Sequence, residues 1–156
     1  MRLRVDVMSK MRGVESFAHL WKRRTTVKLP DGTQCDLLSL PDLVQAKKTQ
    51  RDKDWSMIRR LLEAHYFQHQ QEEDAAALKF WLLELRTPQL LLELARKHRD
   101  LADRLAARRS LLLHASASHL AKLERALDDE EKRQRTQDKA YWLPLLSELE
   151  RLRHPK

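Results

Sequence analysis

Apolar residues recur every three or four positions over most of this chain, from about residue 39 to its end. This spacing places them on one face of an α-helix and argues against a long all-β fold. Only 2 of the 156 residues are glycine, and leucine is concentrated in the second half, which also favours helix. Because 42% of the residues are hydrophobic, the chain can bury a core, and we expect a folded, mostly helical protein.

The first 38 residues carry β-strand signals instead. Leu3, Val5 and Val7 alternate with charged residues, the two-residue period of a strand with one buried face. Because this strand lies so close to residue 1, we expect it at a sheet edge or paired with another copy of the chain as a homo-oligomer. Residues 25–38 predict a β-hairpin with a tight Asp31-Gly32 turn. The predicted fold class is therefore α+β, mostly α: a short N-terminal strand and a β-hairpin, followed by a helical bundle.

Helix-start signals divide the rest of the chain. Ser39 is a favourable N-cap, and Pro41 is tolerated in the first turn that follows it. A break is expected at residues 50–52, and Thr87-Pro88 predicts the start of a further helix. A long helix is predicted from about Ser118, ending near Tyr141-Trp142, where Pro144 kinks or restarts it.

The charge of the chain has two readings. Its net charge of +8 indicates attraction to phosphate, in a nucleotide or a nucleic acid. Its basic residues are also interleaved with acidic ones, as on a simply solvated helical surface. A single cysteine, Cys35, fits a reducing compartment. No stretch is apolar enough for a membrane span, so we expect a cytoplasmic protein.

Three motifs between Arg4 and Asp54 occur in the order and spacing seen in small bacterial nucleotidyltransferase-like proteins. The first is an aspartate-bearing strand followed by a Gly-Val-x-x-Phe helix, and the other two follow the hairpin. In this chain they are Arg4-Val5-Asp6-Val7-Met8 with Gly13-Val14 and Phe17, then Leu38-Ser39-Leu40-Pro41-Asp42-Leu43-Val44-Gln45-Ala46-Lys47, then Arg51-Asp52-Lys53-Asp54. The first third of the chain thus resembles the C-terminal part of a nucleotidyltransferase domain with the polymerase β-type fold.

The resemblance implies an α/β sheet domain in which carboxylates hold Mg²⁺ against a nucleoside triphosphate. Nucleotidyl transfer needs hard oxygen ligands for the metal and positive charge for the phosphates. Asp6 matches the third carboxylate of the family, and Lys47, Arg51 and Lys53 lie near the expected nucleotide cleft. Lys47 and Lys53 match basic positions on the helices after the sheet, where they either reach phosphate or are structural. On this reading residues 1–70 form a partial nucleotidyltransferase-like domain whose strand and hairpin are a remnant of the sheet, and residues 71–156 form a helical tail.

The family's main signature is absent. A Gly-Ser turn followed by two aspartates one residue apart should precede the strand of Asp6, but only five residues do. One aspartate cannot assemble a two-metal site, so Asp6 binds metal only if a partner chain supplies the other carboxylates, or it is a remnant. We expect a truncated nucleotidyltransferase-like protein that is inactive alone or depends on a partner chain.

A second hypothesis is a non-enzymatic helical interaction module. Its basic surface would bind nucleic acid or an acidic protein. The tryptophans at positions 55, 81 and 142 suit base stacking, although each also falls in an apolar stripe and is better explained by core packing. His65 and His69 have a spacing that suits zinc, but with no nearby cysteine or suitably placed glutamate they are better explained as surface residues.

Overall fold

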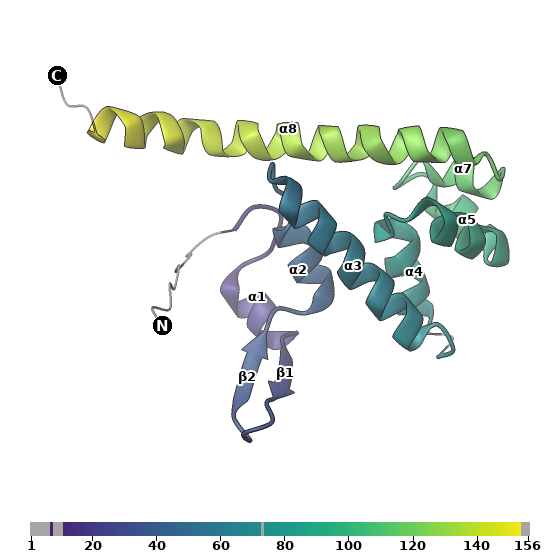
Figure 1. The fold of residues 1–156 in the computed structure, drawn as a ribbon, viewed down its shortest axis with the longest axis horizontal. Helices are drawn as coiled ribbons and strands as arrows, with labels where there is room; N and C mark the ends of the chain where they lie inside the picture. The colour runs from purple at the N-terminus through teal and green to yellow at the C-terminus, as the bar shows by residue number, and fades with distance from the viewer. Residues whose placement is uncertain (1–6, 8–10, 73, 154–156) are drawn as a thin grey trace. The chain divides into compact units, whose positions relative to one another are not determined.

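The computed structural model describes residue 7, residues 11–72 and residues 74–153. In this part of the chain it contains a two-stranded antiparallel hairpin and eight helices, which confirms the mostly α, α+β prediction (Figure 1). The strand predicted at Leu3–Val7 lies outside the described residues except for Val7, which is exposed and in no regular element. In chain order the elements are α1 (Phe17–Lys22), β1 (Thr25–Lys28), β2 (Gln34–Leu37), α2 (Leu40–Ala46), α3 (Asp52–His69), α4 (Ala75–Glu84), α5 (Pro88–Lys97), α6 (Arg99–Leu105), α7 (Leu112–Ser116) and α8 (Leu120–Arg153).

The chain divides into two compact units. The first unit comprises residues 1–48 and 141–156, and the second unit comprises residues 49–140. The last part of α8 therefore belongs to the first unit and its earlier part to the second. The domain boundary expected near residue 70 falls at the C-cap of α3, within the second unit.

The hairpin of the first unit has the predicted position and turn. Val27 lies opposite Cys35 in the antiparallel register. Leu29 donates its amide to the carbonyl of Thr33 at 2.8 Å, and Gly32 closes the turn with a φ of +88°, a conformation that favours glycine. The Asp31 carboxylate accepts a hydrogen bond from the Thr33 amide at 2.9 Å. The Asp-Gly sequence thus forms the turn for which it was identified.

The hairpin has one polar and one apolar face, and both are open to solvent. Residues opposite one another in an antiparallel pair share a face, and alternate residues change face. The register therefore places Val27, Cys35 and Leu37 on the same face. Of these, Val27 and Leu37 are exposed and Cys35 is half-buried. Among residues 11–48, the buried side chains are Leu20, Asp42 and Val44. The described part of this segment therefore has only a small core.

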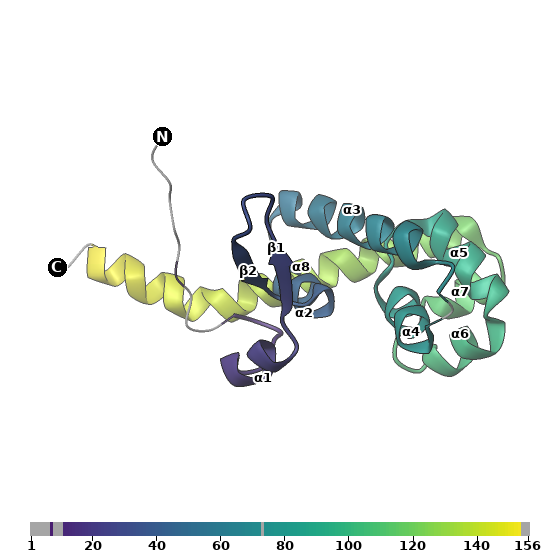
Figure 2. The same cartoon turned by 90° about the horizontal axis from the view of Figure 1, so that it is seen from below.

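The second unit contains a larger helical core. The predicted stripe along α3 is confirmed, with Trp55, Ile58, Leu62 and Tyr66 buried. Helices α4 to α7 pack against one another and α4 also contacts α3, as both views show (Figures 1 and 2). The buried apolar residues contributed by the later elements are Trp81, Leu82, Leu85, Leu91, Leu94, Ala95, Ala102, Leu105, Leu111, Leu112, Ala115, Leu123 and Leu127.

Two predicted boundaries differ from the structure. The helical face running from Leu91 to Leu105 is divided between α5 and α6 at His98, which ends one helix and begins the next. The prediction that the long helix ends near Tyr141 is wrong, because α8 continues through Pro144 to Arg153. Proline removes one backbone donor and crowds one carbonyl, and the good helix formers on both sides offset this local cost.

No helix in the described ranges combines the length and apolar character needed to cross a lipid bilayer.

Candidate functional site

The second family-like motif forms a polar cluster at the start of α2, which we call the Asp42 cluster. Ser39 is the N-cap of α2, as predicted, and its hydroxyl both accepts from the Asp42 amide at 3.4 Å and donates to the Asp42 carboxylate at 2.7 Å. Arg23, the C-cap of α1, donates from Nε and Nη2 to the two oxygens of Asp42 at 2.7 and 2.8 Å. The motif therefore ties α1 to α2 through a bidentate ion pair.

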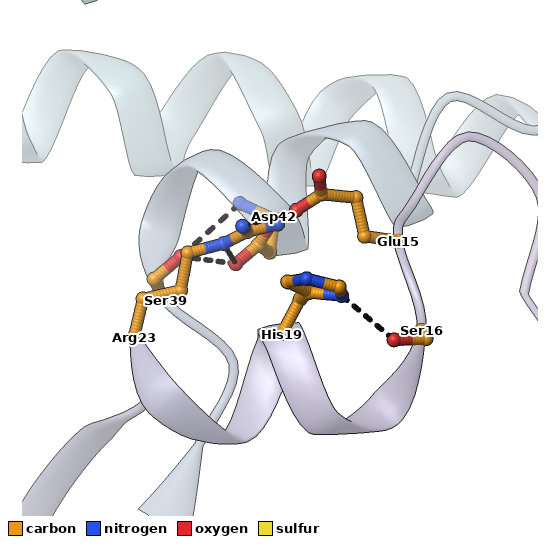
Figure 3. Close-up of polar contacts among 6 residues, drawn as sticks. All are labelled: Glu15, Ser16, His19, Arg23, Ser39 and Asp42. Carbon is orange, nitrogen blue, oxygen red and sulfur yellow. Dashed lines mark hydrogen bonds and ion pairs between the residues drawn. The ribbon is translucent and has the colours of Figure 1, made fainter.

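Glu15 adds a second acid to this cluster. Its carboxylate pairs with Arg23, while Ser16 and His19 form a separate hydrogen bond of 2.8 Å nearby (Figure 3). The two acids raise the pKa of the Arg23 guanidinium further above its usual range. The six residues of Figure 3 are Glu15, Ser16, His19, Arg23, Ser39 and Asp42. Since the single cation of this group is shared by two carboxylates, we assign the Asp42 cluster a structural role.

The Asp42 cluster predicts a dependence of stability on acidic pH. The hydrogen bonds from Arg23, aided by Ser39, hold the pKa of Asp42 below its usual value of about 4. A lowered carboxyl pKa stabilises the folded state above the unfolded pKa, and this contribution is lost as the pH falls through the folded pKa. We expect Asp42→Asn to lower the melting temperature by several degrees at neutral pH and by much less near pH 2. Thermal melts of the parent chain and of Asp42→Asn between about pH 2 and neutral pH measure this difference in melting temperature. A difference that stays constant with pH would contradict the structural assignment.

The third family-like motif forms a comparable cluster at the start of α3, which we call the Asp54 cluster. Asp54 is buried, and one of its carboxylate oxygens accepts from the Thr49 hydroxyl at 2.5 Å and from Arg51 Nε at 2.8 Å. The indole of Trp55 donates to the Thr49 carbonyl at 2.7 Å. Asp138 from α8 accepts from the amide of Gln50 at 3.0 Å. These bonds fix the turn that leads into α3.

The four predicted site residues are therefore not equivalent. Asp6 lies outside the described residues. Lys47 is the C-cap of α2 in the first unit and is half-buried. Arg51 is the N-cap of α3 in the second unit, and its guanidinium is bonded to Asp54. Lys53 is exposed in the first turn of α3. Of these residues, Arg51 has a clear structural function in the Asp54 cluster.

The described residues do not fit a metal centre. Within residues 11–72 and 74–153, no three His, Cys, Asp or Glu side chains are grouped so as to hold a metal ion. The motif carboxylates Asp42 and Asp54 are instead bonded to arginines. No Mg²⁺ chemistry can therefore be derived from the described part of the chain.

The histidine pair of α3 is half-buried and forms hydrogen bonds. His65 accepts from the indole of Trp81 at 3.0 Å, which fixes its Nδ1 as the unprotonated nitrogen. Its ring lies 4.6 Å from that of His69, and His69 pairs with Glu72 at 2.7 Å. The pair thus contributes to packing between α3 and α4.

His65 predicts a second pH dependence. Burial, aided by the neighbouring His69, lowers the pKa of His65 below its usual value of about 6.5. Between the folded and unfolded pKa values the unfolded chain binds more protons, so stability rises as the pH increases to about 6.5. We expect His65→Gln to flatten this rise in melts between pH 5 and 8, because glutamine keeps a hydrogen-bond acceptor without titrating. His119→Gln, at an exposed histidine, should leave the rise unchanged.

The tryptophans divide into core and surface. Trp55 and Trp81 are buried, which confirms the expectation of core packing, and Trp142 is half-buried. Trp21 is 46% exposed, stacks on the even more exposed Phe17 with ring centroids 5.6 Å apart, and is covered by the Arg24 guanidinium at 4.2 Å. Sequence reasoning missed this exposed aromatic cluster, because the spacing of the two rings equally suits a buried helical face.

Sequence reasoning also missed a buried charge cluster in the second unit. Arg109 donates to the carbonyls of Leu82 and Leu85 at 3.0 Å each and to Glu130 at 2.8 Å. Arg86 pairs with the same carboxylate at 2.9 Å and lies over the Trp55 ring at 4.7 Å. Burial lowers the pKa of Arg86, and the charge of Glu130 opposes this effect.

Two adjoining pockets lie beside Arg86, with volumes of about 280 and 180 Å³. They share Arg59, Arg86 and Glu131, and both contain acidic as well as basic side chains. This mixed lining selects no single charge of ligand. The remaining lining residues are Pro88, Glu124, Leu127 and Asp128 in the larger pocket, and Asp52, Trp55, Ser56 and Arg135 in the smaller.

Comparison with models of known protein families, with curated proteins and with solved structures gives no match to this chain. The resemblance to nucleotidyltransferase-like proteins therefore stays a prediction from its three motifs.

Proposed function

We propose that this chain is a nucleotidyltransferase-like protein that is catalytically incomplete and depends on a partner polypeptide. The observation that carries the proposal is the apolar face of the hairpin, which the described residues leave partly exposed, with Val27 and Leu37 at 37% and 52%. A two-stranded hairpin is marginally stable in water, and it gains stability when further strands extend the sheet or a helix packs on its apolar face. Strands of a partner that carried the missing Gly-Ser turn and carboxylate pair would extend this sheet and complete the catalytic centre, and helices of the partner would cover its apolar face.

The hydrogen bonds of the two motifs separate residues with a structural role from residues proposed to contact phosphate. Asp42 and Asp54 hold helix starts in place, and Arg51 positions the beginning of α3 by its bond to Asp54. Lys47 and Lys53 are each assigned to phosphate contact, as point charges on their respective units. Metal ions would need the partner's carboxylates together with Asp6.

The test is binding of a nucleoside triphosphate to the chain alone. We expect millimolar ATP to raise the melting temperature by a few degrees, with little added by Mg²⁺, because the described residues contain no group of acidic side chains placed to hold a metal ion. Lys47→Ala and Lys53→Ala should each reduce the shift. Lys139→Ala, which removes an exposed lysine on α8, is the matched control for the exposed Lys53 and should not. No shift at millimolar nucleotide would count heavily against the proposal.

The exposed aromatic cluster favours one alternative, a non-enzymatic module that binds single-stranded nucleic acid. Residues 1–48 contain ten Lys and Arg against five Asp and Glu, whereas residues 49–140 contain eighteen against sixteen. Phe17 and Trp21 therefore lie in the segment that carries most of the excess positive charge. Exposed rings stack on bases, and nearby cations contact phosphates.

The alternative is tested with a labelled single-stranded oligonucleotide. We expect its affinity to fall steeply as the salt concentration rises, and to fall further in Phe17→Ala and Trp21→Ala. Phe67→Ala, at an exposed aromatic of α3, is the matched control. Absent or salt-insensitive binding would remove this alternative.

A further inference from the structure

The last part of α8, residues 141–153, carries a stripe of exposed leucines. Leu145, Leu149 and Leu152 are 45%, 42% and 71% exposed, and Leu146 beside them is 51% exposed. This segment is the yellow end of α8 in Figure 1. Large apolar side chains that are contiguous and exposed indicate a surface used for association.

The spacing within the stripe is that of a coiled-coil seam. Trp142, Leu145, Leu149 and Leu152 follow one another at intervals of three, four and three residues. These intervals match the a and d positions of successive heptads, which face the partner helix in a two-stranded coiled coil. Pro144 falls at position c of this register, away from the seam, so the missing amide of proline does not interrupt the contact.

The charges beside the seam select a partner and an orientation. In this register Glu148 is at position g and Arg153 is at position e of the next heptad. In a parallel pair of identical helices, position g of one helix lies beside position e of the next heptad in the other helix. Each Glu148 therefore lies beside Arg153 of the second copy. An antiparallel pair would instead place like charges together. The seam is therefore complementary to itself in the parallel orientation.

We propose that residues 142–152 of α8 pair with the same segment of a second copy of this chain, as a short parallel coiled coil. The leucines at a and d form the contact, and the two Glu148–Arg153 pairs set the orientation. This interaction is independent of the proposed nucleotidyltransferase-like function, because a second copy cannot supply carboxylates that the chain itself lacks.

Analytical ultracentrifugation of the full chain tests the proposal. We expect reversible association from the 18.6 kDa monomer to a dimer over the micromolar range. The double variant Leu145→Ser/Leu149→Ser should weaken dimerisation by at least about tenfold. Leu143→Ser is the control, because Leu143 is also an exposed leucine of the same helix, at 56%, but lies at position b. It should dimerise like the parent chain.

Charge exchange tests the orientation separately. Glu148→Arg and Arg153→Glu should each weaken the dimer, and the combined exchange should restore it, because only a parallel pair joins these two positions. Circular dichroism confirms that each variant keeps its helix content. The proposal is overturned by a chain that stays monomeric throughout, by a dimer insensitive to Leu145→Ser/Leu149→Ser, or by a combined exchange that does not restore association.

Discussion

Replacing Arg109 with methionine is expected to lower the free energy of unfolding of the second unit by about 2–4 kcal/mol. Arg109 is buried, and its guanidinium joins the carbonyls of Leu82 and Leu85 to Glu130 on α8. Methionine fills a similar volume but donates no hydrogen bond, so the carbonyls of Leu82 and Leu85 lose a donor away from water, while Glu130 keeps its pairing with Arg86. The cost therefore comes mainly from the two carbonyls, because a buried acceptor that loses its donor is not hydrated in exchange.

Thermal and denaturant unfolding measure this effect. A unit of this size loses about 4–8 °C in melting temperature for each kcal/mol, so the variant should melt far below the parent chain. Arg108→Met is the matched control, because Arg108 is the exposed neighbour, and its melting temperature should change little. A loss below about 1 kcal/mol for Arg109→Met would show that water replaces the guanidinium, and that the cluster is less buried than its geometry indicates.

Features with a local physical cause were predictable from the sequence. The Asp31-Gly32 turn formed because glycine adopts the positive φ that the turn requires. Ser39 caps α2 because its hydroxyl reaches the backbone amide three residues on. Trp55 and Ile58 are buried because they share a helical face. In each case the decisive contact lies within a few residues along the chain.

Features that depend on distant contacts were not predictable from the sequence. No glycine or proline marks the break at His98, and the buried Ala95 and Ala102 on either side of it show close packing at this point. The pairing of Arg109 with Glu130 joins residues 21 positions apart, and both lie among other charged residues. A sequence pattern identifies which face of a helix is apolar, but not which buried charge will find a partner on another helix.

The candidate site also shows the difference between what a local sequence pattern predicts and what distant contacts determine. The motifs around Asp42 and Asp54 were identified by their resemblance to a catalytic family, and in the structure both carboxylates bond to arginines at helix starts. In this chain both motifs therefore fix the start of a helix.

Asp54→Ala is expected to lower the free energy of unfolding by about 2–3 kcal/mol, because it removes two hydrogen bonds to a buried carboxylate. Asp129→Ala is the matched control, since Asp129 is exposed and its pairing with Lys132 at 3.7 Å contributes little. Denaturant unfolding measures both variants.

The nucleotide response of the same variants separates the two roles of the motif. If Asp54 acts structurally, Asp54→Ala lowers the melting temperature while ATP still raises it by the amount seen in the parent chain, because Lys47 and Lys53 remain. If Asp54 instead contacts the nucleotide or its metal, the variant keeps its stability and loses the ATP-induced shift. The second outcome would overturn the structural assignment of the Asp54 cluster and place a catalytic carboxylate at the start of α3.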